Sequence, residues 1–158
     1  MNAIRSRSKK RPNGRNESAA RPRTAEKRKI LVVDDDRFVI AIVTRALKDL
    51  DLEVISADTA SRGAELLRKE GPRLDVCLLD IMLPDTSGIE ACTEYRAIDS
   101  TLPIIFITSD DSSATAIEAT KMGAYDHVLK PLKVLELKAI VEKAREVRRK
   151  MLVPVEMT

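Results

Sequence analysis

Short apolar runs alternate with helical patterns five times along this chain. The runs begin at Ile30, Leu52, Val76, Pro103 and Tyr125, and apolar residues at helical spacing follow each of them. Strands that alternate with helices predict a parallel sheet wound by right-handed crossovers. The sequence therefore predicts an α/β fold, a three-layer doubly wound (βα)5 sandwich with a five-stranded sheet of order 2-1-3-4-5.

The run Val76-Cys77-Leu78-Leu79 leads directly into Asp80. A short, continuous apolar run is typical of a strand that is buried on both faces of a parallel sheet. Asp80 is then expected at the carboxyl end of a central strand, where open α/β sheets hold their ligands. Burial of a lone carboxylate is costly, so Asp80 requires solvent, a partner or a metal.

Three other predicted strands also end in residues with polar or charged side chains. Asp34 and Asp35 follow the first run, Thr108 follows the fourth and Lys130 the fifth. The carboxyl ends of parallel strands share one edge, so these side chains are expected to converge on Asp80. Three neighbouring carboxylates repel unless a cation intervenes. Oxygen ligands without His or Cys favour Mg²⁺, and together with a lysine they are typical of phosphoryl-transfer sites.

Helical patterns predict the remaining elements. The first helix is expected over residues 37–50 with Asp36 as its N-cap. The last is expected over about residues 133–151 and is long enough to project beyond the domain. Its apolar residues near one side are Leu135, Ile140, Ala144, Val147 and Met151.

Charge is distributed unevenly along the chain. Residues 1–29 hold 11 Lys/Arg against 2 acidic residues, a net charge of +9, whereas residues 30–158 carry 17 against 23, a net charge of −6. We predict a disordered basic extension over residues 1–28, one folded domain over 29–151 and a tail over 152–158. No apolar stretch predicts membrane insertion. Cys77 and Cys92 are expected to be reduced, packed thiols in a cytoplasmic protein.

Four stretches together resemble the receiver domains of bacterial response regulators, across roughly residues 28–150. They are 30–36 (ILVVDDD), 78–88 (LLDIMLPDTSG), 107–109 (ITS) and 128–131 (VLKP). The resemblance implies a flavodoxin-like fold of the chemotaxis-receiver type. It also implies a signalling role in a two-component system or phosphorelay and a protein that is not an enzyme beyond its own phosphorylation and dephosphorylation.

The resemblance implies roles for individual residues. Asp80 would accept a phosphoryl group from a sensor histidine kinase or a histidine phosphotransfer protein. Asp35, Asp80 and the backbone carbonyl of Met82 would ligate Mg²⁺, and Asp34 would assist directly or through water. The modified domain would then bind a downstream protein partner or form a homodimer through the face built from residues 108–150.

Further implied roles concern switching. Lys130 would contact the phosphoryl group, Thr108 would move to hydrogen-bond it, and the peptide bond between Lys130 and Pro131 would be cis. Where the family has Tyr or Phe, this chain has His127, which is either a surface imidazole or a switch residue whose charge changes near neutral pH. The residues two beyond Asp80 and Thr108 tune hydrolysis in the family. Because Met82 cannot orient water, we expect a long-lived acyl phosphate.

Three alternatives stay open at this stage. Asp34-Asp35-Asp36 after a strand resembles haloacid-dehalogenase-type phosphatases with Asp34 as nucleophile, although Phe38 stands where that family has Thr. The chain is alternatively the receiver fragment of a longer DNA-binding transcriptional regulator. Nucleic-acid binding is otherwise expected only weakly, through residues 1–29.

Overall fold

Five parallel strands form a single sheet in the order β2-β1-β3-β4-β5, which confirms the predicted topology. The computed structural model describes residues 27–109 and 113–152. The expectations for the basic extension, for Asp110 (the residue two beyond Thr108) and for the end of the tail concern residues outside these ranges. The strands are β1 (Arg28–Val33), β2 (Leu52–Ala57), β3 (Leu74–Asp80), β4 (Ile104–Thr108) and β5 (Asp126–Leu129).

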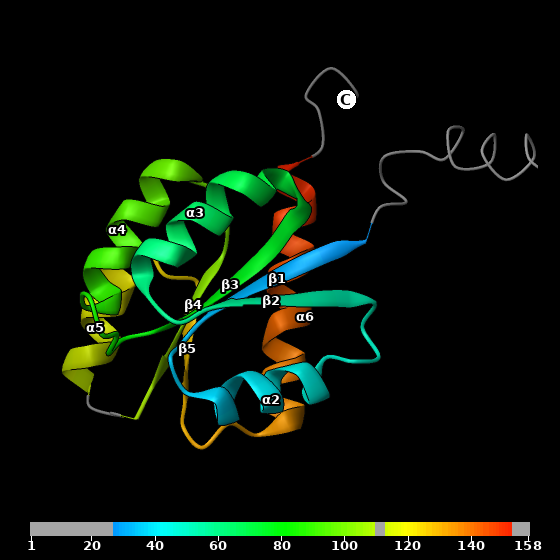
Figure 1. Ribbon diagram of the computed structural model, residues 1–158, viewed down its shortest axis with the longest axis horizontal. Coiled ribbons are helices and arrows are strands. Elements are labelled where there is room, and N and C mark those ends of the chain that lie inside the picture. The colour runs from blue at the N-terminus through cyan, green and yellow to red at the C-terminus, as the bar shows by residue number, and fades with distance from the viewer. Residues whose placement is uncertain (1–26, 110–112, 153–158) are drawn as a thin grey trace, which may run out of the picture.

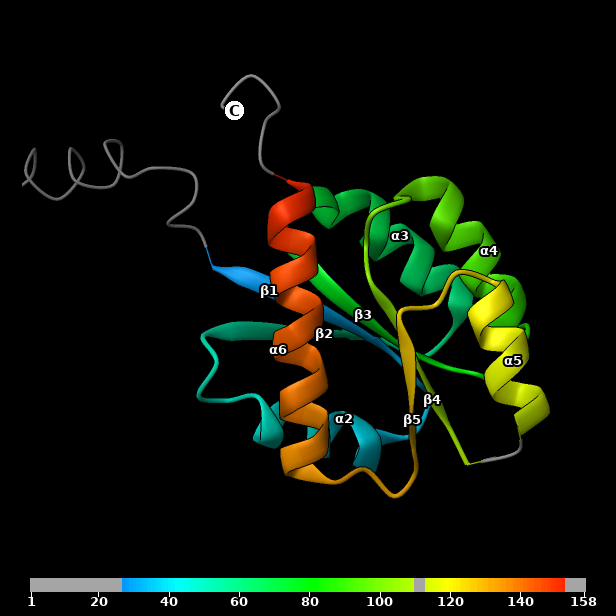
Figure 2. The ribbon, with the colours of Figure 1, turned by 180° about the vertical axis from the view of Figure 1, so that it is seen from behind.

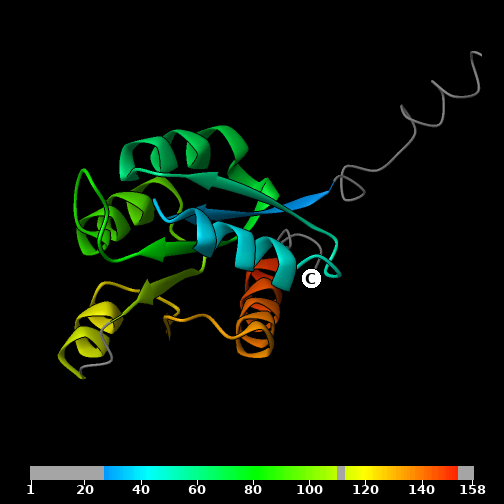
Figure 3. The same cartoon turned by 60° about the horizontal axis from the view of Figure 1, so that its bottom comes forward.

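Helices cover both faces of the sheet, as Figures 1 and 2 show from opposite sides. They are α2 (Arg37–Ala46), α3 (Ala60–Glu70), α4 (Gly88–Ile98), α5 (Ser113–Lys121) and α6 (Val134–Met151), with a short 3₁₀ turn, η2 (Gly71–Arg73), after α3. Helices α3, α4 and α5 pack on one face, and α2 and α6 pack on the other. Figure 3 shows α3 and α2 on opposite sides of the strands. Within the described residues, none of these helices has both the length and the apolar character of a membrane crossing.

The sheet separates two apolar cores. Alternate residues of the central strands face opposite sides, so Leu31 and Leu79 join the core under α3 and α4, whereas Val32 and Leu78 join the core under α2 and α6. All seven residues of β3 are buried. Full burial on both faces explains why the central run is continuously apolar rather than alternating.

Local signals set the ends of several helices. The Asp36 side chain accepts a hydrogen bond from the Phe38 amide and caps α2, as predicted. Thr59 caps α3 in the same way, by accepting from the Arg62 amide. Helix α2 ends at Ala46, earlier than the predicted residue 50, because the chain turns over residues 47–50 to reach β2.

The prediction for the buried side of α6 was right only in part: Ala144 is buried and Ile140 packs half-buried against the core, as expected. The residues that α6 buries are Leu137, Val141, Ala144 and Arg148. Leu135 and Met151, which were expected on the apolar side, are 81% and 59% exposed. The true stripe has regular helical spacing, but it ends in an arginine, so its last member was not recognised as a core residue.

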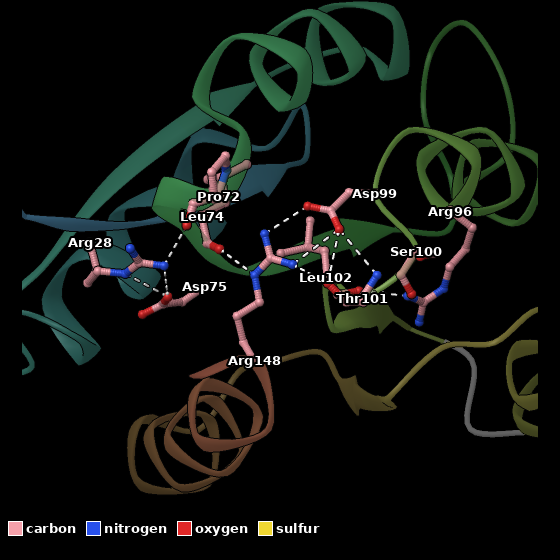
Figure 4. A network of polar contacts seen from close by, with 10 residues as sticks. All are labelled: Arg28, Pro72, Leu74, Asp75, Arg96, Asp99, Ser100, Thr101, Leu102 and Arg148. Carbon is pink, nitrogen blue, oxygen red and sulfur yellow. Dashed lines mark hydrogen bonds and ion pairs between the residues drawn. The ribbon is translucent and has the colours of Figure 1, made fainter. Parts of the chain in front are cut away.

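Arg148 ties the end of α6 to the domain instead of letting the helix project freely. Its side chain is 1% exposed and points into the network drawn in Figure 4. Its Nε atom donates to the Leu74 carbonyl at 2.9 Å, and its two terminal nitrogens donate to the Asp99 carboxylate at 3.1 and 2.7 Å. Thr101 Oγ1 accepts a further hydrogen bond at 2.6 Å. A buried guanidinium is tolerated here because its donors are paired.

A second carboxylate at the same edge joins both ends of the domain. Asp75 accepts hydrogen bonds from Arg28 Nε and Nη2 at 2.9 and 2.8 Å, and from Arg145 Nε at 3.0 Å. Arg28 opens β1, and Arg145 lies in α6. The first strand and the last helix therefore meet at one shared anion, on the side of the sheet opposite to the strand ends that carry Asp34 and Asp80.

Candidate functional site

The carboxyl edge of the sheet brings three aspartates together. Asp34 follows β1, Asp80 ends the neighbouring β3, and Asp35 lies beside Asp34. One carboxylate oxygen from each of the three lies within 4.8 Å of the other two. Lys130, just after β5, places its Nζ atom 3.3 Å from Asp34 Oδ2 and 3.3 Å from Asp80 Oδ2.

Backbone groups orient the two buried carboxylates. Asp34 Oδ1 accepts from the Asp36 amide at 2.8 Å, and Asp80 Oδ1 accepts from the Met82 amide at 3.1 Å. The Oδ2 atom of each is the one that approaches Lys130. Gly88 opens α4 so close to the site that an added Cβ would collide with the Asp80 carbonyl. The loop that follows Asp80 is therefore fixed by backbone packing.

The charges at this site do not balance. Burial raises the pKa of Asp34 to about 6, and the Asp80 charge adds to this, while the hydrogen bond from Asp36 and the Lys130 ammonium act in the opposite direction. Burial lowers the pKa of Lys130, but Asp80 and Asp34 outweigh it, so the net shift is upward. One ammonium facing three carboxylates leaves the site with an excess of negative charge.

The donor set fits a hard divalent cation. Asp34 Oδ2 is a buried oxygen for which the described residues supply no hydrogen bond of good geometry, only the ion pair with Lys130. The gathered ligands are all oxygens, and small hard cations such as Mg²⁺ prefer carboxylate oxygens and water. An unsatisfied buried oxygen beside two further carboxylates is what such an ion would compensate.

The remaining predicted residues lie along β4 and β5. Thr108 is buried at the end of β4, and its carbonyl accepts from the Lys130 amide at 2.8 Å. The peptide bond between Lys130 and Pro131 is cis. His127 lies on β5 opposite Phe106, with its side chain 36% exposed and its Nδ1 atom 3.8 Å from Asp126. Whether Thr108 and His127 act as switch residues stays a prediction.

One residue near the site was not recognised from sequence. The two carboxylate oxygens of Asp85 accept hydrogen bonds from the Ala60 and Ser61 amides, each at 3.0 Å. These hydrogen bonds, the one from Ala60 above all, hold the pKa of Asp85 below its usual range. The loop after Asp80 is thus tied to the start of α3. The partners lie about 25 residues away in sequence, so no local pattern signals the contact.

The fold and this edge define a class of domain: a doubly wound parallel sheet with an acidic, lysine-bridged site at its switch point. Comparison with protein families agrees with that class. The model of the response regulator receiver domain matches residues 30–142. The chain belongs to this family, and it is therefore a receiver domain of the two-component response regulators rather than a haloacid-dehalogenase-like phosphatase.

Individual relatives support the assignment. The chain is 38% identical over 114 residues to the regulatory protein VanR of Enterococcus faecium. The aligned region covers 72% of this chain and 48% of VanR. The chain thus spans about half the length of this curated relative. A CheY-like receiver domain protein from Methanospirillum hungatei is 25% identical with a TM-score of 0.73, covering 80% of this chain and 99% of that one. The receiver domain of NtrX from Brucella abortus is 30% identical with a TM-score of 0.68, covering 74% and 98%.

Proposed function

We propose that this domain is a phosphorylation-dependent switch in which Asp80 accepts a phosphoryl group from a histidine kinase or a histidine phosphotransfer protein. The observation that carries the proposal is the bridging position of Lys130, whose Nζ atom lies 3.3 Å from both the Asp34 and Asp80 carboxylates. A cation in that position neutralises charge on a phosphoryl group that arrives at Asp80.

The transfer is a displacement at phosphorus. A carboxylate oxygen of Asp80 attacks the phosphorus atom, the phosphorus–nitrogen bond of the phosphohistidine breaks, and the imidazole leaves with the electron pair and takes up a proton. Asp80 becomes an acyl phosphate. The Met82 amide, which donates to Asp80 Oδ1, holds the carboxylate in one orientation so that Oδ2 is the oxygen that faces Lys130.

The aspartates would hold Mg²⁺ as the cofactor, with the Met82 carbonyl as a further ligand. When bound, the ion would neutralise charge on the phosphoryl oxygens. Asp34 contributes a buried oxygen that accepts no well-formed hydrogen bond from the described residues, and Asp35 an exposed carboxylate close to it. Lys130 keeps its ammonium at the site because the neighbouring carboxylates raise its pKa.

Switching is proposed to start at Thr108. A phosphoryl group at Asp80 offers acceptor oxygens, and a hydroxyl at the end of β4 is a donor that such a group recruits. Movement there would reach α5, which begins five residues after β4 ends. A downstream protein or a second copy of the chain would then bind the face built from residues 108–150, with His127 at its margin.

The proposal is tested by labelling with radioactive acetyl phosphate. Wild type should be labelled with Mg²⁺ and not with EDTA, and Asp80→Asn should lose the label. The same variant separates the receiver from a phosphatase with Asp34 as nucleophile, because only the latter predicts full labelling of Asp80→Asn. Labelling of Asp80→Asn at the wild-type level would therefore refute the proposal.

A further inference from the structure

The loop between Asp80 and Gly88 doubles back on itself beside the aspartates. At its base the Met82 amide donates to Asp80 Oδ1 at 3.1 Å, and the Gly88 amide donates to the Ile81 carbonyl at 2.6 Å. Met82 and Ser87 face each other in an isolated antiparallel bridge. The loop is therefore a tight hairpin, and one arm of it carries both the amide that orients Asp80 and the Met82 carbonyl.

A second helix holds the hairpin from the outside. Asp85 lies between the two bridged residues, and its carboxylate accepts from the amides of Ala60 and Ser61, the first two residues of α3, each at 3.0 Å. Hydrogen bonds from backbone amides to an ionised carboxylate are stronger than those between neutral groups, and the start of a helix attracts negative charge. Asp85 thus attaches the hairpin to α3.

The start of α3 is a firm base for this attachment. The hydroxyl of the fully buried Tyr95, in α4, donates to the Ala60 carbonyl at 2.8 Å. Gly63 lies so close to that hydroxyl that an added Cβ would collide with it. The first residue of α3 is therefore held from two sides, by the Asp85 carboxylate and by the Tyr95 hydroxyl.

We propose that Asp85 is a positioning residue for the metal: by anchoring the hairpin to α3, it holds the Met82 carbonyl where it can bind Mg²⁺. The inference rests on the proposed function, because it requires Mg²⁺ to bind beside Asp80. Asp85 acts through the hairpin and does not itself bind the ion, because α3 amides engage both of its oxygens. Replacement of residues that orient the ligands of a metal typically weakens its binding by roughly 10–100-fold.

The test measures Mg²⁺ binding and the rigidity of the hairpin on the same samples. Isotope-labelled wild type, Asp85→Ala, Asp85→Asn and Asp80→Asn are titrated with Mg²⁺ alone, and the shifts of the backbone amide signals in NMR spectra give Kd. Hydrogen exchange of the Met82 amide is measured without metal. Thr59→Ala is the matched control, because Thr59 caps the same end of α3 through a different amide, that of Arg62, at 3.1 Å.

Asp85→Ala should raise the Kd for Mg²⁺ about tenfold and speed exchange of the Met82 amide, whereas Thr59→Ala should match wild type in both. Asp85→Asn should fall between them, because its remaining oxygen can still accept one of the two hydrogen bonds.

Three results would overturn the inference. They are an unchanged Kd in Asp85→Ala (or in Asp85→Asn, should Asp85→Ala fail to fold), an equal rise of Kd in Thr59→Ala, and unchanged exchange at Met82. Wild type that does not bind Mg²⁺, or Asp80→Asn that binds it as tightly as wild type, would instead refute the proposed function.

Discussion

Removal of the Asp99 carboxylate tests how much the buried arginine contributes to the domain. In wild type, Arg148 is 1% exposed and donates two hydrogen bonds to Asp99, whose side chain is 19% exposed. Asp99→Ala leaves the guanidinium buried, and among the described residues Leu74 and Thr101 are then its remaining partners. Breaking a buried pair in this way typically costs about 3–5 kcal/mol, and the partial exposure of Asp99 places our expectation near the lower end, at about 3 kcal/mol.

Equilibrium urea unfolding at pH 7 measures this loss as a lower midpoint with an unchanged slope. Glu146→Ala is the control, because it breaks the exposed ion pair between Glu146 and Arg149, which is worth about 0.5 kcal/mol or less. A loss below about 1 kcal/mol for Asp99→Ala, no larger than that of the control, would refute the argument that Arg148 depends on its buried anion.

Acid pH provides a second test of the same pair. Burial alone would raise the pKa of Asp99, but the hydrogen bonds and the charge of Arg148 outweigh it and hold the pKa below the usual 3.8. The stabilisation by the ionised Asp99 carboxylate is therefore complete above pH 3.8, and it is lost as the pH falls through the lowered pKa of Asp99 in the native state. The difference in unfolding free energy between wild type and Asp99→Ala should shrink in that acid range. A difference that does not change with pH would contradict the claim that the ionised carboxylate stabilises the fold.

Further predictions concern the site and its surroundings. Burial raises the pKa of Asp34 to about 6. Between pH 3.8 and about 6 the metal-free native state therefore binds more protons than the unfolded state, and the free energy of unfolding falls as the pH rises through that range. Asp34→Asn should therefore raise the melting temperature of the metal-free protein at pH 7.5 and have little effect at pH 4; a lower melting temperature at pH 7.5 would contradict this. Asp85→Ala should lower the midpoint of urea unfolding by uncapping α3, whereas the exposed Asp58→Ala should leave it unchanged. The acyl phosphate of wild type should outlast that of Met82→Asn after removal of the phosphodonor, because an amide can orient the attacking water; equal half-lives would exclude the idea. Partner binding by wild type and His127→Tyr should diverge between pH 6 and 8, and identical pH profiles would leave His127 without a switching role.

The sheet and the convergence of its strand ends could be predicted because each strand carries its own local signal. The run that ends in Asp80 is apolar on both faces, and parallel strands bring their carboxyl ends to one edge regardless of the loops between them. The meeting of Asp34 and Asp80 followed from that rule together with the strand order. Lys130 followed in the same way, from its place directly after the fifth strand.

Contacts that depend on distant partners could not be predicted. Arg148 has the helical spacing of a core residue, but an arginine is buried only where the fold supplies acceptors, and Asp99 lies 49 residues away. The contact of Asp85 could not be predicted for the same reason, because the sequence around a loop aspartate does not indicate which helix amides it caps. Asp75 is held by two arginines from opposite ends of the domain, Arg28 and Arg145. In each case the determining interaction is tertiary, and the sequence pattern around the residue is uninformative.

Identification of the modified residue in wild-type protein tests the central claim most directly. After incubation with acetyl phosphate and Mg²⁺, borohydride reduces an acyl phosphate to an alcohol and marks its position permanently, so that peptide mass spectrometry can locate it. We predict a single reduced side chain, at Asp80, which appears with Mg²⁺ and is absent with EDTA. Reduction at Asp34, or at none of the three clustered aspartates, would contradict the assignment of Asp80 as the phosphoacceptor.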